Sequence, residues 1–177
     1  MNRMLIAIDG SDCAKGAVEY VGRQFAANRD LRISLLHVLP YPPAPFWDDG
    51  HILSEAEKTL RNQVIEKWLA NQRAKLEPLF KEAAEILISQ GIKPEQIEKK
   101  SISDSTDIAE SILEETRDGG YQTLVLGRCG LSASKRFLMG SVTTKIINHG
   151  AGIAIAIHER GYYPRGGGRV TITAAKT

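Results

Sequence analysis

The sequence predicts a single α/β domain built on a doubly wound parallel sheet with helices on both faces. Two observations carry this prediction. Short apolar runs alternate five times with segments whose apolar residues recur at helical spacing, which is typical of parallel strands joined by crossover helices. The fourth run also leads directly into a glycine-rich segment that precedes a helix. The 177 residues, 42% of them hydrophobic and 25% charged, suit one domain with a substantial core.

The first quarter of the chain predicts two strands and the helix between them. Residues 4–8 form an apolar run that ends at Asp9, and Ser11 is suited to cap the following helix. Residues 33–38 form the second strand, which Pro40 stops. Because prolines fix φ and remove backbone donors, we expect the proline-rich residues 40–50 to form a loop.

The rest of the chain continues the alternation of helix and strand. Pro78 is expected to kink or split the long helical segment, and Asp104 or Ser105 to cap the helix after the third strand. The remaining elements are a helical segment at 54–90, strands at 97–102, 123–126 and 152–157, and a helix at 141–148. We expect one domain over residues 1–158 and, over residues 159–177, a flexible tail or a short added strand near 170–173.

The glycine-rich segment predicts a phosphate-binding site. Gly127, Gly130 and Gly140, followed by Ser141, form the pattern G-x2-G-x9-G-S between a strand and a helix. Glycines let the backbone approach a ligand closely, and a helix start offers unpaired N–H groups to an anion. The pattern is neither a P-loop nor the G-x-G-x-x-G of dinucleotide-binding folds.

The predicted topology indicates a nucleotide as the ligand. If the first strand is central, Asp9, Val38 and Gly127 converge at the carboxyl edge of the sheet, where ligands of such folds bind. A carboxylate accepts hydrogen bonds from an adenine amino group or a ribose hydroxyl, and the backbone of Val38 can serve a base edge. A flavin carrier is an alternative, which the visible absorbance of the protein would reveal.

These residues resemble the universal stress protein family, in its ATP-binding branch. The resemblance rests on residues 6–11 (IAIDGS), 36–38 (LHV) and 103–104 (SD), and on the glycine pattern extended by Val142. The glycine pattern is the specific part. The resemblance implies strand order 3-2-1-4-5, a homodimer paired through residues 152–157, and bound ATP, with Mg²⁺ held through the phosphates.

The resemblance also implies a role for each matching position. Asp9 and the Val38 backbone look like adenine contacts. Gly127 and Gly130 would line the ribose and phosphates, while Gly140, Ser141 and Val142 would hold the phosphates. Arg128, at a variable position, either adds positive charge near the phosphates or is solvated.

Enzymatic and signalling alternatives find less support in the sequence. Fast phosphoryl transfer needs groups that position a metal and a nucleophile, and no dedicated residues for this are evident. A phosphoreceiver domain would need clustered acids after strand one, but Asp9 has no acidic neighbour before Asp12, and His158 stands where a lysine is required. We therefore expect ATP to act as a conformational ligand, with slow hydrolysis as the enzymatic alternative.

Charge, the amino terminus and cysteine content indicate the expected partners and cellular location. The net charge of +2, with both signs mixed along the chain, gives no reason to expect nucleic-acid binding. The amino terminus has too short an apolar stretch for a membrane span or signal peptide. Cys13 and Cys129 have neither metal-ligand spacing nor the density of a disulfide scaffold, so we expect a reducing, cytoplasmic location.

Overall fold

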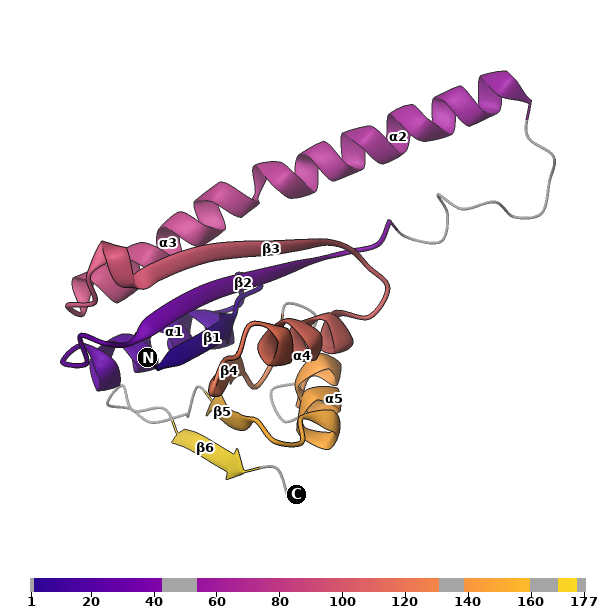
Figure 1. Cartoon of the computed structure of the whole chain (residues 1–177). Coiled ribbons are helices and arrows are strands. Elements are labelled where there is room, and N and C mark those ends of the chain that lie inside the picture. Colours follow the sequence, from indigo (N-terminus) through magenta and orange to yellow (C-terminus); the bar gives the residue numbers. More distant parts are fainter. Residues whose placement is uncertain (1, 43–53, 131–138, 160–168, 175–177) are drawn as a thin grey trace.

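A computed structural model describes residues 2–42, 54–130, 139–159 and 169–174, and its centre is one twisted sheet (Figure 1). The strand order is β3-β2-β1-β4-β5-β6. The first five strands are parallel, which confirms the predicted doubly wound fold and the order 3-2-1-4-5. The strands are β1 (Arg3–Ala7), β2 (Arg32–Pro40), β3 (Ile97–Ser105), β4 (Thr123–Gly127), β5 (Ala154–Glu159) and β6 (Arg169–Ala174).

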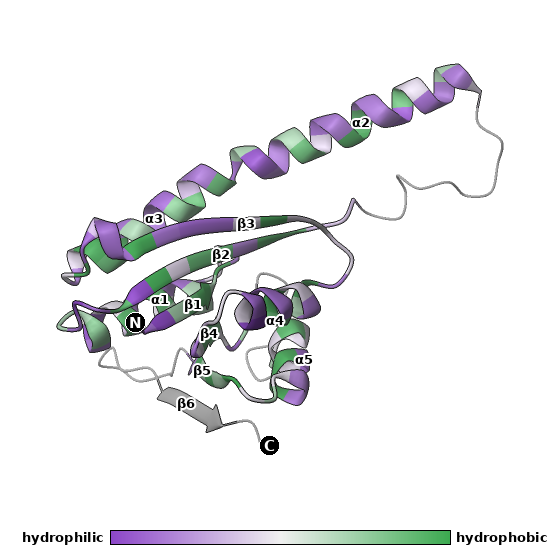
Figure 2. Ribbon diagram, viewed as in Figure 1, coloured by the Kyte–Doolittle hydropathy of each residue, from purple (hydrophilic) through white to green (hydrophobic). Residues whose placement is uncertain are grey.

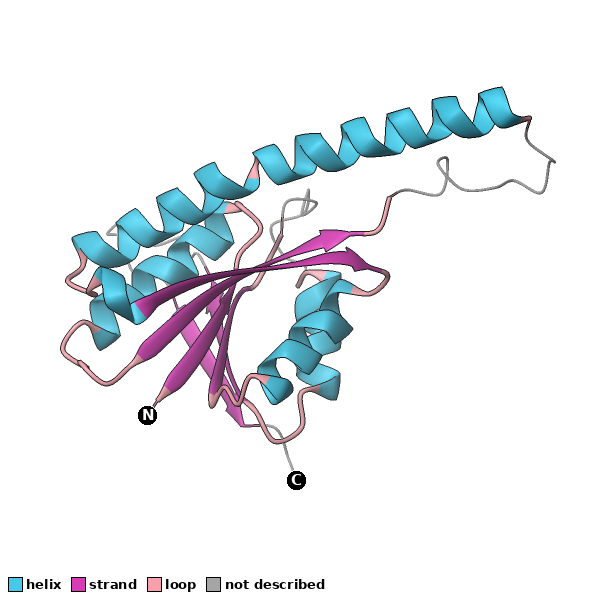
Figure 3. Cartoon of the chain, turned by 45° about the horizontal axis from the view of Figure 1, so that its top comes forward, coloured by secondary structure: helices cyan, strands magenta, loops and turns pink. Residues whose placement is uncertain are grey.

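Helices cover both faces of the sheet (Figure 3). They are α1 (Asp12–Phe25), α2 (Glu55–Ala74), α3 (Leu76–Ser89), α4 (Ile108–Asp118) and α5 (Ser141–His149), with a short 3₁₀ turn at Pro94–Gln96. One core lies under α1 and α3 and includes Ile6, while the other lies under α4 and α5 and includes Leu5. Neighbouring residues of β1 thus serve opposite cores, as the alternation of a strand requires.

The predicted long helix is split three residues before Pro78. Helix α2 ends and α3 begins around Lys75, whose backbone N–H donates to the carbonyls of Arg73 and Gln72. Pro78 lies in the first turn of α3, where a missing N–H costs little. Helix α2 has no buried residue and extends away from the sheet, and Figure 2 shows it as mostly hydrophilic with separate hydrophobic positions.

The predicted cap of α4 is wrong. Neither Asp104 nor Ser105 caps the helix, because β3 continues as far as Ser105, which pairs with Pro40. The N-cap is Asp107, whose side chain accepts a hydrogen bond from the backbone N–H of Glu110. Because β3 extends to Ser105, α4 begins only at Ile108.

The chain covers the outer edge of β5 itself. Strand β6 pairs antiparallel with β5 from Ala154↔Ala174 to Glu159↔Arg169. Strand β6 therefore occupies the edge of residues 152–157 through which the resemblance implies pairing with a second copy. The tail returns to the sheet and fills the hydrogen-bonding positions that an edge strand leaves open.

Candidate functional site

The glycine loop lies at the carboxyl edge of the sheet, between the end of β4 and the start of α5. Two hydrogen bonds hold these elements together: the Thr143 hydroxyl donates to the Gly127 carbonyl at 3.0 Å, and the Gly140 N–H donates to the Arg128 carbonyl at 2.9 Å. Gly140 is the N-cap of α5 and makes no side-chain cap hydrogen bond. The first turn of α5 is therefore directed at the loop, as the predicted phosphate site requires.

The three glycines have different surroundings. A Cβ on Gly127 would lie 2.7 Å from the Cys13 carbonyl carbon and 2.8 Å from the Ala14 nitrogen, so this glycine is needed for close packing of β4 against α1. A Cβ on Gly130 would lie 2.8 Å from Oδ2 of Asp9. A Cβ on Gly140 would meet its nearest atom, the Arg128 carbonyl oxygen, at an ordinary 3.5 Å.

Asp9 faces the glycine loop from the end of β1. Its Oδ1 accepts a hydrogen bond from the Ser11 backbone N–H at 2.9 Å, which orients the carboxylate. The turn between them passes through Gly10, whose φ of 82° suits glycine. Because the Cβ position of Gly130 is so close to Oδ2, the two sequence-predicted residues Asp9 and Gly130 lie next to each other at the carboxyl edge of the sheet.

Arg128 lies in the loop but is engaged elsewhere. Its Nε is 3.2 Å from Oε1 of Glu159 at the end of β5, and its backbone N–H donates to the His158 carbonyl. The side chain is only 19% exposed. In the described structure this side chain therefore pairs with Glu159 at the end of β5.

The two cysteines form a disulfide across this site. Cys13, in the first turn of α1, is bonded to Cys129 in the glycine loop, with their Cα atoms 5.8 Å apart. The spacing of the two cysteines in the sequence therefore did not indicate this disulfide. The residues are 116 positions apart in the chain, but β1 and β4 are neighbours and place the starts of α1 and of the loop together.

A cavity of about 400 Å³ lies at the carboxyl edge of the sheet, between the starts of α4 and α5, and is within the size range of small-molecule sites. Ser141 and Val142 line it, so these two predicted residues are at its wall, while Val38 is buried in the core just before the end of β2. Its other lining residues come from the ends of β2 and β3 and from the starts of α4 and α5: Pro40, Tyr41, Ser105, Thr106, Asp107, Ile108, Ala109 and Lys145.

An ion pair in this cavity was not anticipated from the sequence. Lys145, one turn into α5, donates to the carboxylate of Asp107, the α4 cap. The hydrogen bond with Asp107 raises the pKa of Lys145, and the same bond lowers the pKa of Asp107. The sequence did contain a signal for Lys145. It lies four residues after Ser141 in a predicted helix, and residues at this spacing share one face.

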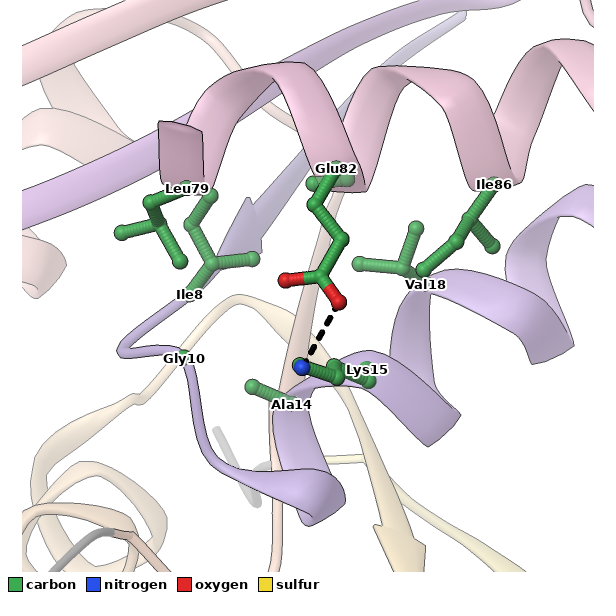
Figure 4. Close-up of a pocket in the computed structure, with 9 residues that line it drawn as sticks. Ile8, Gly10, Ala14, Lys15, Val18, Leu79, Glu82 and Ile86 are labelled. Atoms are coloured by element: carbon green, nitrogen blue, oxygen red, sulfur yellow. Dashed lines mark ion pairs between the residues drawn. The ribbon is translucent and has the colours of Figure 1, made fainter. Parts of the chain in front are cut away.

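A second crevice, between α1 and α3, is too small to hold a nucleotide (Figure 4). Its volume is about 10 Å³, roughly the room of one water molecule. Lys15 and Glu82 form an ion pair of 2.7 Å beside it, and the hydrogen bond that Lys15 donates to Glu82 raises the pKa of Lys15. The surrounding side chains, which include Ile8, Val18 and Leu79, are apolar, so this crevice belongs to the core.

Two histidines close to the site have structural surroundings. His37 Nδ1 donates to the Ile8 carbonyl at 2.7 Å, which is a structural hydrogen bond. His158 is buried against α1, where a Cβ on Gly16 would lie 2.4 Å from the His158 ring. Burial lowers the pKa of His158, which favours the neutral imidazole.

Together, these elements define a doubly wound α/β protein with a cavity at the carboxyl edge of its sheet. Residues 1–151 match the sequence profile of the universal stress protein family. The chain belongs to this family.

Similar proteins agree with this assignment. Universal stress protein YxiE of Bacillus subtilis (strain 168) is 26% identical over 158 residues, which cover 82% of this chain and 90% of YxiE. The structure of hypothetical protein MJ0577 is similar with a TM-score of 0.65 and 21% identity, covering 92% of this chain and 98% of that one. A universal stress protein family protein from Arabidopsis thaliana with AMP bound has a TM-score of 0.58 and 17% identity, covering 92% and 94%. At such low identities, the two structural similarities establish a shared fold and nothing further.

In the part of the chain that the structure describes, no helix has both the length and the apolar character needed to cross a membrane.

Proposed function

We propose that this protein binds an adenine nucleotide, ATP in particular, at the carboxyl edge of its sheet and uses it as a conformational ligand in a stress response. The observation that carries the proposal is the meeting of Asp9, Gly130 and the α5 N-terminus around one loop. A carboxylate for the nucleoside and backbone N–H groups for the phosphates are the two kinds of contact that a nucleotide needs. The AMP-bound Arabidopsis relative supports the choice of adenine.

All the predicted site residues except Arg128 have a part in this proposal. Asp9 accepts hydrogen bonds from the nucleoside, and the backbone of Val38 serves the adenine edge. Gly127 keeps β4 close to α1, and Gly130 leaves room for the ligand. The backbone N–H groups of Ser141 and Val142, at the start of α5 after Gly140, receive the phosphates.

Lys145 adds a charge that the sequence analysis did not assign. The side chain is 39% exposed and lines the 400 Å³ cavity together with Ser141. Its carboxylate partner Asp107 is 43% exposed, and ion pairs between such exposed groups are worth little, about 0–1 kcal/mol. Lys145 is therefore free to exchange Asp107 for a nucleotide phosphate at small cost. Mg²⁺ would be held through the phosphates.

The homodimer predicted through residues 152–157 enters this proposal in altered form. Strand β6 occupies the edge that a second copy would use, so pairing between two β5 strands requires β6 to detach first. Nucleotide binding does not depend on that step, because the residues assigned to the site come from a single chain.

We expect hydrolysis of the bound ATP to be slow, below the ~1 s⁻¹ at the lower end of ordinary enzymes. The groups assigned to the site contact phosphates in the ground state, whereas fast transfer requires a positioned nucleophile and stronger contacts in the transition state. Single-turnover hydrolysis with magnesium measures the rate. A non-hydrolysable ATP analogue, tested beside ATP for ordering of the loop by hydrogen exchange, should reproduce its effect. Turnover above that rate, or an inactive analogue, would favour an enzyme.

A further inference from the structure

The disulfide lies within the proposed nucleotide site. Cys129 is the second residue between Gly127 and Gly130, and Cys13 is the second residue of α1. We propose that the Cys13–Cys129 disulfide is a reversible redox switch that sets the nucleotide affinity of the glycine loop. This inference rests on the proposed function, because it assigns a form of regulation to the same site.

The disulfide is placed to hold the loop in its binding shape. The Ser11 hydroxyl donates to the Cys129 carbonyl at 3.3 Å, a long and therefore weak hydrogen bond. On either side of Cys129, the Arg128 carbonyl accepts from Gly140, and Gly130 lies against Asp9. A covalent bond at Cys129 thus fixes the residue whose neighbours contact both the nucleoside side and the phosphate side of the site.

The surroundings of the two sulfurs favour reduction by an external dithiol. Cys13 is only 6% exposed, whereas Cys129 is partly exposed, so an incoming thiolate attacks the sulfur of Cys129. Cys13 lies in the first turn of α1, a helix of 14 residues, and the positive end of the helix stabilises a thiolate there. Cys13 is consequently a good leaving group.

The reaction balances with a dithiol as the reductant. Its first thiolate forms a bond to Cys129 Sγ while the Cys13–Cys129 bond breaks and the electron pair stays on Cys13. Its second thiolate then attacks the mixed disulfide and releases Cys129 as a thiolate. The external dithiol becomes a disulfide, and the protein gains two electrons. Solvent can then protonate the two cysteine thiolates.

Oxidation should strengthen binding. A loop that is already fixed in its bound shape loses less conformational entropy when the nucleotide arrives. Once the bond is broken, the covalent link from residues 127–130 to α1 is lost, and contacts such as the long Ser11 hydrogen bond and the packing of Gly127 remain. The reduced protein should therefore bind the same nucleotide more weakly.

The test compares the ATP affinity of the full chain in its two redox states by calorimetry. We expect reduction with dithiothreitol to weaken ATP binding by roughly tenfold. This factor corresponds to the conformational entropy lost when one or two additional side chains are ordered on binding. The double variant Cys13→Ser, Cys129→Ser should bind like the reduced protein and ignore dithiothreitol. Alkylation before and after reduction, read by mass, should add no group and then two groups per chain.

The outcomes separate this inference from the proposed function. Equal affinity of the oxidised and reduced protein, or tighter binding after reduction, overturns the switch while leaving the nucleotide site intact. Alkylation of both cysteines without reductant overturns it as well. Absence of ATP binding in both redox states of the folded protein refutes the nucleotide site itself, and the switch with it.

Discussion

Replacing Gly130 with valine is expected to weaken ATP binding by at least about tenfold while the protein stays folded. The added Cβ would lie 2.8 Å from Oδ2 of Asp9, closer than atoms tolerate, so the carboxylate must turn away. Because that oxygen is the end of a flexible side chain, the protein can adjust without unfolding. The ligand, however, loses both the space above the loop and the oriented carboxylate. Calorimetry with ATP measures the affinity, and circular dichroism reports the fold.

The matched control for this variant is Ala151→Val. Ala151 is exposed in the turn before β5, at the amino edge of the sheet and therefore opposite the glycine loop. This substitution also adds a branched side chain, but far from the proposed site. We expect unchanged ATP affinity. If Gly130→Val binds ATP as well as the control does, Gly130 is not part of the site.

Replacing Gly127 with alanine is expected to lower the free energy of unfolding, by about 1–3 kcal/mol, the usual cost of overpacking. The new Cβ would lie 2.7 Å from the carbonyl carbon and 2.8 Å from the following nitrogen in the backbone of α1, at Cys13 and Ala14. Backbone atoms of a packed helix cannot turn aside as a side chain does, so β4 and α1 must move apart. Urea denaturation at constant redox state measures the loss.

Gly140→Ala is the comparison for this stability effect. The nearest atom to its Cβ position is 3.5 Å away, and an alanine at a helix N-cap costs about 0.5–1 kcal/mol relative to glycine. Gly127→Ala, which also forces backbone atoms apart, should therefore destabilise the protein more than Gly140→Ala. Equal stability of the two variants would show that the contact between β4 and α1 does not require glycine at position 127.

Local patterns in the sequence were sufficient to predict most of the fold. The apolar run before Asp9, the cap at Ser11 and the apolar run before Gly127 each act through neighbouring residues, and each is confirmed. The cap of α4 failed because a strand's end depends on its partner: β3 extends to Ser105 by pairing with β2, which no local signal encodes. Strand β6 (Arg169–Ala174) matches the added strand that was one of the two alternatives for the tail, but its antiparallel pairing with β5 is a tertiary contact that no local signal encodes.

The candidate site was predictable where its residues end strands and was not where it depends on tertiary contacts. Asp9 and Gly127 follow from the rule that ligands bind at the carboxyl ends of parallel strands. The disulfide between Cys13 and Cys129 joins positions 116 residues apart and could not be inferred from their spacing. Lys145 was also missed, because its exposure to the cavity depends on how α4 and α5 meet at Asp107.

The most direct test of the account is a calorimetric titration of the intact, oxidised protein with ATP, after removal of any nucleotide carried through purification. The account predicts saturable binding of one ATP per chain, with much weaker binding of GTP, whose base presents a carbonyl in place of the adenine amino group that Asp9 or the Val38 backbone would recognise. Absence of measurable ATP binding by a protein that is shown to be folded would contradict it.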